Sequence, residues 1–441
     1  MPTTFRPYQP DQSYLLPPSP RDWLPEGHLA YFISETVESL DLGAFYEPYE
    51  GDGRRNQPFD PRLMVKVLVY AYATGTFSSR RIARKLEENV AYRVLAAGSF
   101  PAHRTICEFR QRHLEAFKAL MVQVVQVARE AGLAKLGCLA VDGTKVKANA
   151  SKHKAMSYGR MREEEERLRE QIGELTRRAA AVDAQEDAEY GQEVRGDELP
   201  EELQRREGRL RKIQEAKARL EARQAAEDEQ KGRHAGDGRK SPRGGPDFKR
   251  DFGVPPDKAQ DNFTDPESRI MKISSGGYEQ CYNAQIAVDE DSQLIVAAEV
   301  TDNAADSGQL LPVLDAAKSA TGREASQVLA DAGYKGEENL KGLEQRGIDG
   351  YISLAREGKP IAEPAEEYPA TRRMAAKLQG EEGRRRYRRR KAVVEPVFGW
   401  IKGILGFRCF SLRGLKRVQG EWGLVCLAVN LKRLQALQAA G

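Results

Sequence analysis

Three short apolar runs in this chain each end on a single acid: Leu139–Asp142, Val328–Asp331 and Val393–Glu395. A desolvated carboxylate is costly unless it is paired, protonated or metal-bound. The first two runs predict buried strands, and the third belongs to a helix. Three acids on two strands and one helix supply the oxygen ligands that two hard divalent cations require. The pattern predicts a metal-dependent enzyme that acts on phosphodiesters.

The bulk composition excludes several classes of protein. A chain of 441 residues can hold two or three domains, and its apolar runs are all too short to cross a membrane. No signal peptide is visible, so we expect a cytosolic protein. The five cysteines never form a Cys-x-x-Cys pair, which predicts reduced thiols and neither a zinc site nor a disulfide framework. They are Cys107, Cys138, Cys281, Cys409 and Cys426.

The charge is unevenly distributed. The whole chain carries +4, but between Thr371 and Arg433 there are 17 Lys and Arg against 4 Asp and Glu. Such a basic region indicates a polyanionic partner, because cations that replace counterions gain affinity for phosphates. A run of seven cations precedes Glu395, and we expect it to contact phosphates rather than to be a solvated face or a localisation signal. Its residues are Arg384, Arg385, Arg386, Tyr387, Arg388, Arg389, Arg390 and Lys391, of which Tyr387 could stack on an unpaired base.

The first 132 residues read as a helical domain behind a Pro-rich arm. Asp60-Pro61 predicts a helix start, and the following apolar residues keep helical spacing up to Gly75. Short helices are expected over 79–86, 90–95 and 103–113, in a region with 9 basic and 4 acidic residues between Thr76 and Lys118. This favours a helix-turn-helix-like module over an ordinary helical cap. The predicted DNA contacts there are Arg80, Arg81, Arg84, Arg104 and Arg110.

A long charged insertion interrupts the second domain. A strand is expected over 138–141 within the segment 133–153, and residues 154–260 then predict a helical hairpin followed by a flexible linker over 231–256. Strands over 282–288, 294–300, 327–330 and 351–354, with helices over 310–320 and 337–346, predict a mixed α/β sheet in residues 261–441. Residues 355–383 read as irregular, and helices are expected from about residue 386 to the end.

The element order places the acids together. If the strands ending at Asp142 and Asp331 are neighbours, their carboxyl ends bring the two carboxylates side by side. Glu395 and Lys402 are seven residues apart, about two helical turns, and so share one margin of their helix. Asp302 and Asp306 are competing acids for which a turn role is expected. His153 and His234 have no partner at ligand spacing and are expected to be solvated.

These motifs together resemble the DDE transposases of bacterial insertion sequences. The resemblance is carried by the segments around Asp142 (LAVDGTKVKANA), Asp331 (VLADAGYKG) and Glu395 (VVEPVFGWIKG), and it extends over nearly the whole chain. The family's third motif places a Tyr seven and an Arg four residues before the Glu, and a Lys seven residues after it. Here Lys402 fits, but the Tyr and Arg positions hold Arg388 and Lys391, and Tyr387 stands one place early.

The resemblance implies an RNase H-like fold, with Asp142, Asp331 and Glu395 binding two Mg²⁺ or Mn²⁺ ions for strand cleavage and strand transfer. It also implies binding to double-stranded DNA at transposon ends and at a target, by a homodimer or higher assembly. Lys402 and the basic run would hold the DNA end. Two alternatives stay open: a structure-selective nuclease on the same fold, and a transposase-derived regulator without catalysis. The insertion is a candidate contact to flanking DNA or to another subunit.

Overall fold

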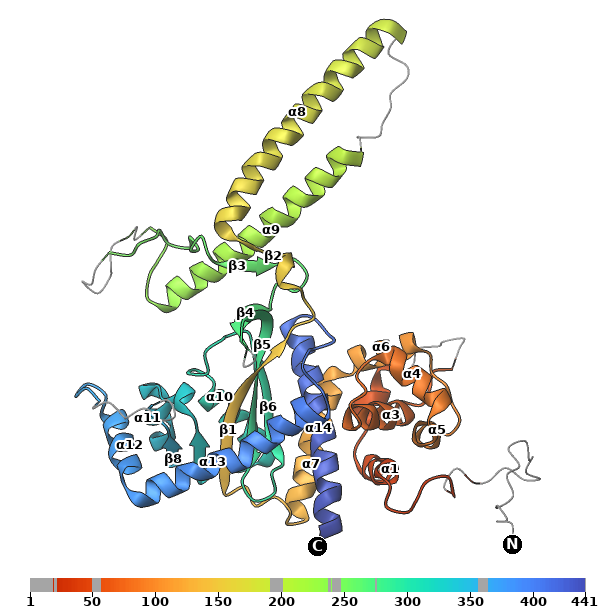
Figure 1. Ribbon diagram of the computed structural model, residues 1–441, viewed down its shortest axis with the longest axis vertical. Helices are drawn as coiled ribbons and strands as arrows, with labels where there is room; N and C mark the ends of the chain where they lie inside the picture. Colours follow the sequence, from red (N-terminus) through yellow and green to blue (C-terminus); the bar gives the residue numbers. More distant parts are fainter. Residues whose placement is uncertain are drawn as a thin grey trace, which may run out of the picture.

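The computed structural model describes residues 19, 22–49, 57–190, 201–236, 239, 247–273, 276–355 and 364–440. Most of the Pro-rich N-terminal arm and the turn of the helical hairpin therefore lie outside the described residues. Within them, a helical hairpin projects from a larger body built on a sheet (Figure 1). No helix in the described part of the chain is long and apolar enough to cross a membrane.

A six-stranded mixed sheet forms the centre of the body. β1 pairs antiparallel with β5 and parallel with β7, β7 pairs parallel with β8, and β5 also pairs antiparallel with β4 and β6. The expected mixed α/β sheet is thus confirmed, with β4 as an additional short strand. The strands are β1 (Cys138–Lys147), β4 (Arg269–Lys272), β5 (Tyr278–Asp289), β6 (Ile295–Thr301), β7 (Gln327–Ala330) and β8 (Asp349–Ile352).

β1 is longer than the sequence predicts. Its continuously buried run ends at Val141, but the strand continues to Lys147 because residues 142–147 keep pairing with β5. Only the parallel pairing with β7 stops at Val141, which lies opposite Ala330. The expectation that Asp142 closes the strand is therefore wrong. Asp142 instead marks the point where β1 leaves β7 and continues with β5 alone.

Helices cover the sheet. α10 (Leu310–Thr321), α7 (Leu114–Glu130) and α14 (Leu415–Ala440) pack against β6, whereas α13 (Glu381–Gly399) crosses β1, β5, β7 and β8. α11 (Glu337–Gln345) and α12 (Pro369–Gln379) contact the edge strand β8. The prediction that residues 355–383 are irregular is wrong for α12, whose Ala370, Met374 and Leu378 bury one face at helical spacing.

The N-terminal helices share one core with the sheet. Asp60 caps α3 by accepting the backbone N–H of Arg62 at 2.7 Å, and α3 packs against α14. In α14 the buried Trp422 donates its indole N–H to the backbone oxygen of Gln285 in β5 at 3.1 Å. The expected short helices are confirmed. The elements are α1 (Leu29–Ser39), α2 (Gly43–Tyr46), η2 (Glu47–Tyr49), α3 (Pro61–Ala73), α4 (Ser79–Glu88), α5 (Val90–Leu95) and α6 (His103–Arg112).

The insertion is a separate unit with a small core of its own. It starts at η3 (Lys152–Lys154) and β2 (Ala155–Ser157), forms the predicted hairpin of α8 (Tyr158–Tyr190) and α9 (Glu201–Gln230), and returns through β3 (Gln260–Asn262). The fully buried carboxylate of Asp261 is bound by Arg219 and Arg223 of α9, which fixes the hairpin to β3. Its core residues are Tyr158, Met161, Leu168, Ile213, Ala216 and Leu220.

Two residues of the expected flexible linker, Arg233 and Phe248, are packed against each other. Arg233 is buried, pairs with Asp228 at 2.9 Å and lies over the ring of Phe248 at 4.1 Å. These contacts hold both sides of the segment against the end of α9. The prediction of a flexible linker is therefore wrong for Arg233 and Phe248 themselves.

Candidate active site

Asp142 and Asp331 occupy equivalent positions on neighbouring parallel strands. Val141 of β1 lies opposite Ala330 of β7, and each acid is the next residue of its chain segment. Adjacent strands are about 4.8 Å apart, so the two carboxylates project from neighbouring backbone positions. Asp331 accepts the N–H of Gly333 at 2.8 Å and caps the short helix η4 (Ala332–Tyr334). The two strand acids lie side by side, as the element order predicts.

Asp142 is bound by an arginine of α13. Its Oδ2 accepts a hydrogen bond from Nη1 of Arg390 at 2.8 Å, and its Oδ1 accepts the N–H of Gly143. Only 18% of the Asp142 side chain is exposed, and only 10% of that of Arg390. Burial raises the pKa of Asp142 to about 6; the charge of Asp331 adds to this rise, and that of Arg390 opposes it.

Glu395 lies next to Arg390, the arginine that binds Asp142. Its Oε1 lies 3.8 Å from Nη2 of Arg390, and its side chain is 56% exposed. Arg390 therefore lies between Asp142 and Glu395 and brings a positive charge to both. The prediction that Arg390 is a surface contact for DNA is wrong in this structure, because the guanidinium is buried inside the acidic cluster.

A further acid, Asp306, lies beside the two strand acids. Its Oδ1 accepts hydrogen bonds from Lys145, Asn283 and Gln285, at 3.2, 2.7 and 2.8 Å respectively. A Cβ added at Gly333 would lie 2.9 Å from Asp331 and 3.2 Å from Asp306, so this glycine is needed where the two acids approach. Asp302, the other competing acid, instead pairs with Arg269 at 2.5 Å.

Asp306 is the site residue that the sequence reasoning set aside as a turn. The signal is the pair Asn283 and Gln285, two polar residues that lie among apolar residues in the middle of β5 and are completely buried. Buried amides need partners, and Asp306 supplies one to each. Gln285 also accepts the hydroxyl proton of the buried Tyr334, whose pKa is raised by burial and by the charges of Asp306, Asp142 and Asp331.

Lys402 is held on β1 rather than displayed at the surface. It lies in a π-helical turn, η5 (Trp400–Ile404), which follows Pro396 inside α13. Its ammonium donates to the hydroxyl of Thr144 and, at 3.0 Å, to the backbone oxygen of Lys145. Burial lowers the pKa of Lys402. The apolar side chains of this segment, Val394, Ile401 and Leu405, are all buried.

The remaining cations of the basic run divide into two groups. Arg386 and Arg389 bind the largely buried Glu290, with Arg386 Nη2 at 2.5 Å. Burial opposes the ionisation of Glu290, but its hydrogen bonds to both arginines lower its pKa. Tyr387 is half-buried. Arg384, Arg385, Arg388 and Lys391 are exposed, and their predicted contact with DNA stays a prediction.

In the N-terminal region, Arg110 does not reach the surface. It is 4% exposed and donates to the hydroxyl of Tyr72 at 2.9 Å and to the backbone oxygen of Phe77 at 2.8 Å. The Tyr72 hydroxyl in turn donates to the buried Glu421 at 3.0 Å. The prediction that Arg110 contacts DNA is therefore wrong. Arg80, Arg81, Arg84 and Arg104 are exposed, as a DNA contact requires.

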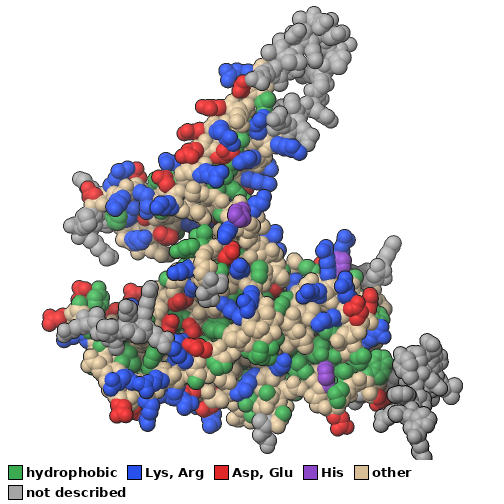
Figure 2. All heavy atoms as spheres, viewed as in Figure 1, with side chains coloured by type: hydrophobic (Ala, Val, Ile, Leu, Met, Phe, Trp, Pro, Cys, Tyr) green, Lys and Arg blue, Asp and Glu red, His purple; other side chains and the backbone are tan. Residues whose placement is uncertain are grey.

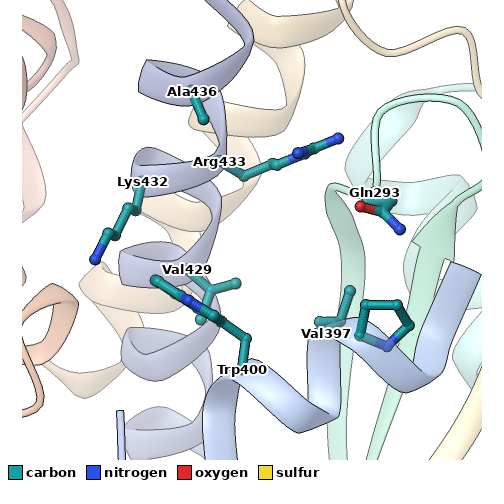
Figure 3. Close-up of a pocket in the computed structure, with 8 residues that line it drawn as sticks. Gln293, Val397, Trp400, Val429, Lys432, Arg433 and Ala436 are labelled. Atoms are coloured by element: carbon teal, nitrogen blue, oxygen red, sulfur yellow. The ribbon is translucent and has the colours of Figure 1, made fainter. Parts of the chain in front are cut away.

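A cavity of about 300 Å³ lies between α13 and α14 (Figure 3). Trp400 and Val397 line it from the α13 side, and Lys432, whose ammonium is 4.7 Å from the centre of the Trp400 ring, lines it from α14. Gln293 closes one side by donating to the backbone oxygen of Ala392. None of the acids of the candidate site is among its lining residues.

The donor set suits a hard cation, but the acids are not gathered around one point. Asp142, Asp331 and Asp306 offer carboxylate oxygens of the type that Mg²⁺ and Mn²⁺ prefer. Among the described residues, however, no three His, Cys, Asp or Glu side chains are grouped closely enough to hold a metal ion. Arg390 supplies the positive charge between Asp142 and Glu395.

Two protein-family models match the chain and define it as a transposase. The model described as Transposase DDE domain matches residues 251–431, and the Transposase domain (DUF772) matches residues 18–112. No curated protein and no solved structure matches. The resemblance noted from the sequence is confirmed: the chain belongs to the DDE transposases of insertion sequences. Residues 113–250, with Asp142 and the hairpin, lie outside both matches.

Proposed function

We propose that this protein binds the terminal inverted repeats of its insertion sequence and catalyses DNA cleavage and strand transfer at Asp142, Asp331 and Glu395. The observation that supports this most is the register of β1 and β7. It aligns Asp142, which lies outside both family matches, with Asp331, which lies inside the match to the DDE domain. α13 then brings Glu395 toward Asp142 through Arg390. The strand order, with an antiparallel β1–β5–β6 part and a parallel β1–β7–β8 part, supports an RNase H-like domain.

The proposed cofactor is a pair of Mg²⁺ or Mn²⁺ ions held by Asp142, Asp331 and Glu395. When bound, the ions would supply positive charge to the attacking and leaving oxygens of an in-line displacement. For Asp142 to offer both oxygens, Arg390 must release Oδ2. Lys402, anchored on β1, holds α13 in place.

The proposed division of labour follows the two matched regions. Residues 1–132 would recognise the end sequence through the exposed Arg80, Arg81, Arg84 and Arg104. Residues 133–153 and 261–441 would form the catalytic domain, and 154–260 the insertion. Strand transfer at two ends also requires two active sites, so we propose a dimer or higher assembly on DNA.

Cleavage assays with the DNA that flanks the gene test this proposal. Asp142→Asn, Asp331→Asn and Glu395→Gln should each abolish cleavage of end DNA in Mg²⁺ while end binding in a mobility-shift assay persists. Asp302→Asn, a neighbouring acid outside the cluster, is the matched control and should cleave normally. Near-normal cleavage by any of the first three would contradict the assignment of that acid.

The same assay separates the two alternatives. A structure-selective nuclease would cut without joining ends to a second duplex, so strand-transfer products in a two-oligonucleotide assay argue for the transposase. A regulator without catalysis would show neither activity in any divalent cation. The buried, costly carboxylate of Asp142 favours an enzyme, because a protein that only binds DNA gains nothing from it.

A further inference from the structure

A second cationic site lies at the root of the hairpin. A cavity of about 560 Å³ opens where η3 and β2 meet α8 and α9. The cavity lining contains five basic side chains and no Asp or Glu. The basic residues are His153, Lys154, Arg160, Arg209 and Lys212.

The positive charge of this cavity is largely uncompensated. Arg209 pairs with Glu164 at 2.8 Å. Lys154, Arg160 and Lys212 are exposed and make no ion pair with any residue that the structure describes. Like charges gathered in a concave surface repel one another and raise the local potential, which costs stability unless an anion binds. Figure 2 shows Lys and Arg side chains gathered over the part of the hairpin nearest the body.

The floor of the cavity is apolar. Ile213 and Phe263, with Met156 beside them, belong to the small core of the hairpin. The buried Ile213 and the half-buried Phe263 fix the cationic rim on a folded base rather than on a mobile loop. A rim of cations over an apolar floor suits the phosphate and sugar of a nucleic acid backbone, which presents charged and apolar surface in turn.

The cavity is also within reach of the candidate active site. β1 leads from Asp142 toward η3, so Asp142 and His153 are eleven positions apart in the chain. Fully extended, such a segment spans at most about 36–40 Å. One turn of B-form DNA covers about 34–36 Å. A duplex whose scissile phosphate lies at Asp142 therefore has backbone within one helical turn that can reach the hairpin root.

We propose that the hairpin root is a DNA-backbone clamp, in which Lys154, Arg160 and Lys212 bind phosphates within about one helical turn of the cleaved position. The inference deepens the proposed function and rests on it for the position of the cleaved end. It gives the insertion a role in positioning the duplex. Because it uses phosphates alone, the clamp adds affinity without adding sequence preference.

The test compares two matched double variants of the full chain. Arg160→Ala with Lys212→Ala removes two cations of the clamp. Arg177→Ala with Arg211→Ala removes two exposed cations from the same two helices, outside the cavity lining. Binding is measured by fluorescence anisotropy on a duplex carrying the terminal repeat, over a series of KCl concentrations, and circular dichroism verifies that the helices persist.

The clamp variant should bind on the order of tenfold more weakly, and the slope of log affinity against log salt should fall by about 2, one unit for each lost phosphate contact. Phosphate-ethylation interference should lose its signal within one turn of the cleaved end. Unchanged affinity and slope, or an equal loss in the control variant, would overturn the proposal. These readouts do not involve cleavage. If the wild-type protein did not cleave end DNA but the clamp variant still lost affinity and salt dependence, the catalytic assignment would be refuted and the clamp would stand.

Discussion

Replacing Asp142 with Asn should change how the stability of the protein depends on pH. The pKa of Asp142 is raised from 3.8 to about 6 in the folded protein, with burial as the main cause. Because the folded pKa lies above the unfolded one, ionisation of Asp142 favours the unfolded state. This cost is absent below about pH 3.8, grows up to about pH 6, and is constant above that. A shift of this size corresponds to about 3 kcal/mol.

Roughly half of that cost, about 1–2 kcal/mol, arises between about pH 5 and pH 7.5. The assay is urea denaturation of the full chain at these two pH values, with EDTA present. The free energy of unfolding of Asp142→Asn relative to the wild type should rise by about 1–2 kcal/mol from the lower to the higher pH. Asp291→Asn removes a surface carboxylate and controls for the loss of one charge.

Divalent cations sharpen this test. Since a bound cation favours the ionised carboxylate, excess Mg²⁺ should stabilise the wild type above pH 6 and leave the Asn variant unchanged. A relative stability that is the same at both pH values would refute the reasoning. It would mean that Arg390 fully compensates the burial of Asp142 and that no cation is needed there.

Two further predictions follow from the buried arginines. Arg390→Ala frees Oδ2 of Asp142 and should tighten Mn²⁺ binding, measured by electron paramagnetic resonance. Arg384→Ala removes an exposed arginine and should leave the Mn²⁺ affinity unchanged. Equal affinities of the two variants would show that Arg390 does not compete with the metal. Arg110→Met leaves the buried Glu421 without its cation and should lower the free energy of unfolding by about 3–5 kcal/mol. Its folded fraction should bind end DNA normally, and a selective loss of binding would restore Arg110 as a DNA contact.

The strand acids could be predicted from the sequence because their signal is local. A continuous apolar run such as Leu139–Val141 marks a strand buried on both faces, and the first charged residue after it marks where that burial ends. Two such strands in parallel register then bring Asp142 and Asp331 together. The hairpin was predictable for a similar reason, since its two helices are long and their few apolar residues recur at helical spacing.

Whether the Arg390 side chain points into the protein or toward solvent could not be predicted in this way. Seven cations in eight residues carry no periodicity, so the sequence does not distinguish the buried Arg390 from the exposed Arg388 or Lys391. Only the path of α13 across β1 selects the inward face. Asp306 and Arg110 were misjudged for the same reason, because their partners Asn283, Gln285 and Tyr72 are distant in sequence.

The path of α13 also accounts for the irregular third motif. Relative to the family pattern, the Tyr387–Arg390 pair lies one residue early, which lengthens the interval to Glu395. On a regular α-helix, the twelve residues from Arg390 to Lys402 would leave these side chains about 120° apart. The π-helical turn at Trp400–Ile404 rotates less per residue and brings Lys402 back toward β1. Both cations then reach the same strand, Arg390 at Asp142 and Lys402 at Thr144. Glu395, between these two cations in the sequence, is left at the exposed margin of the helix.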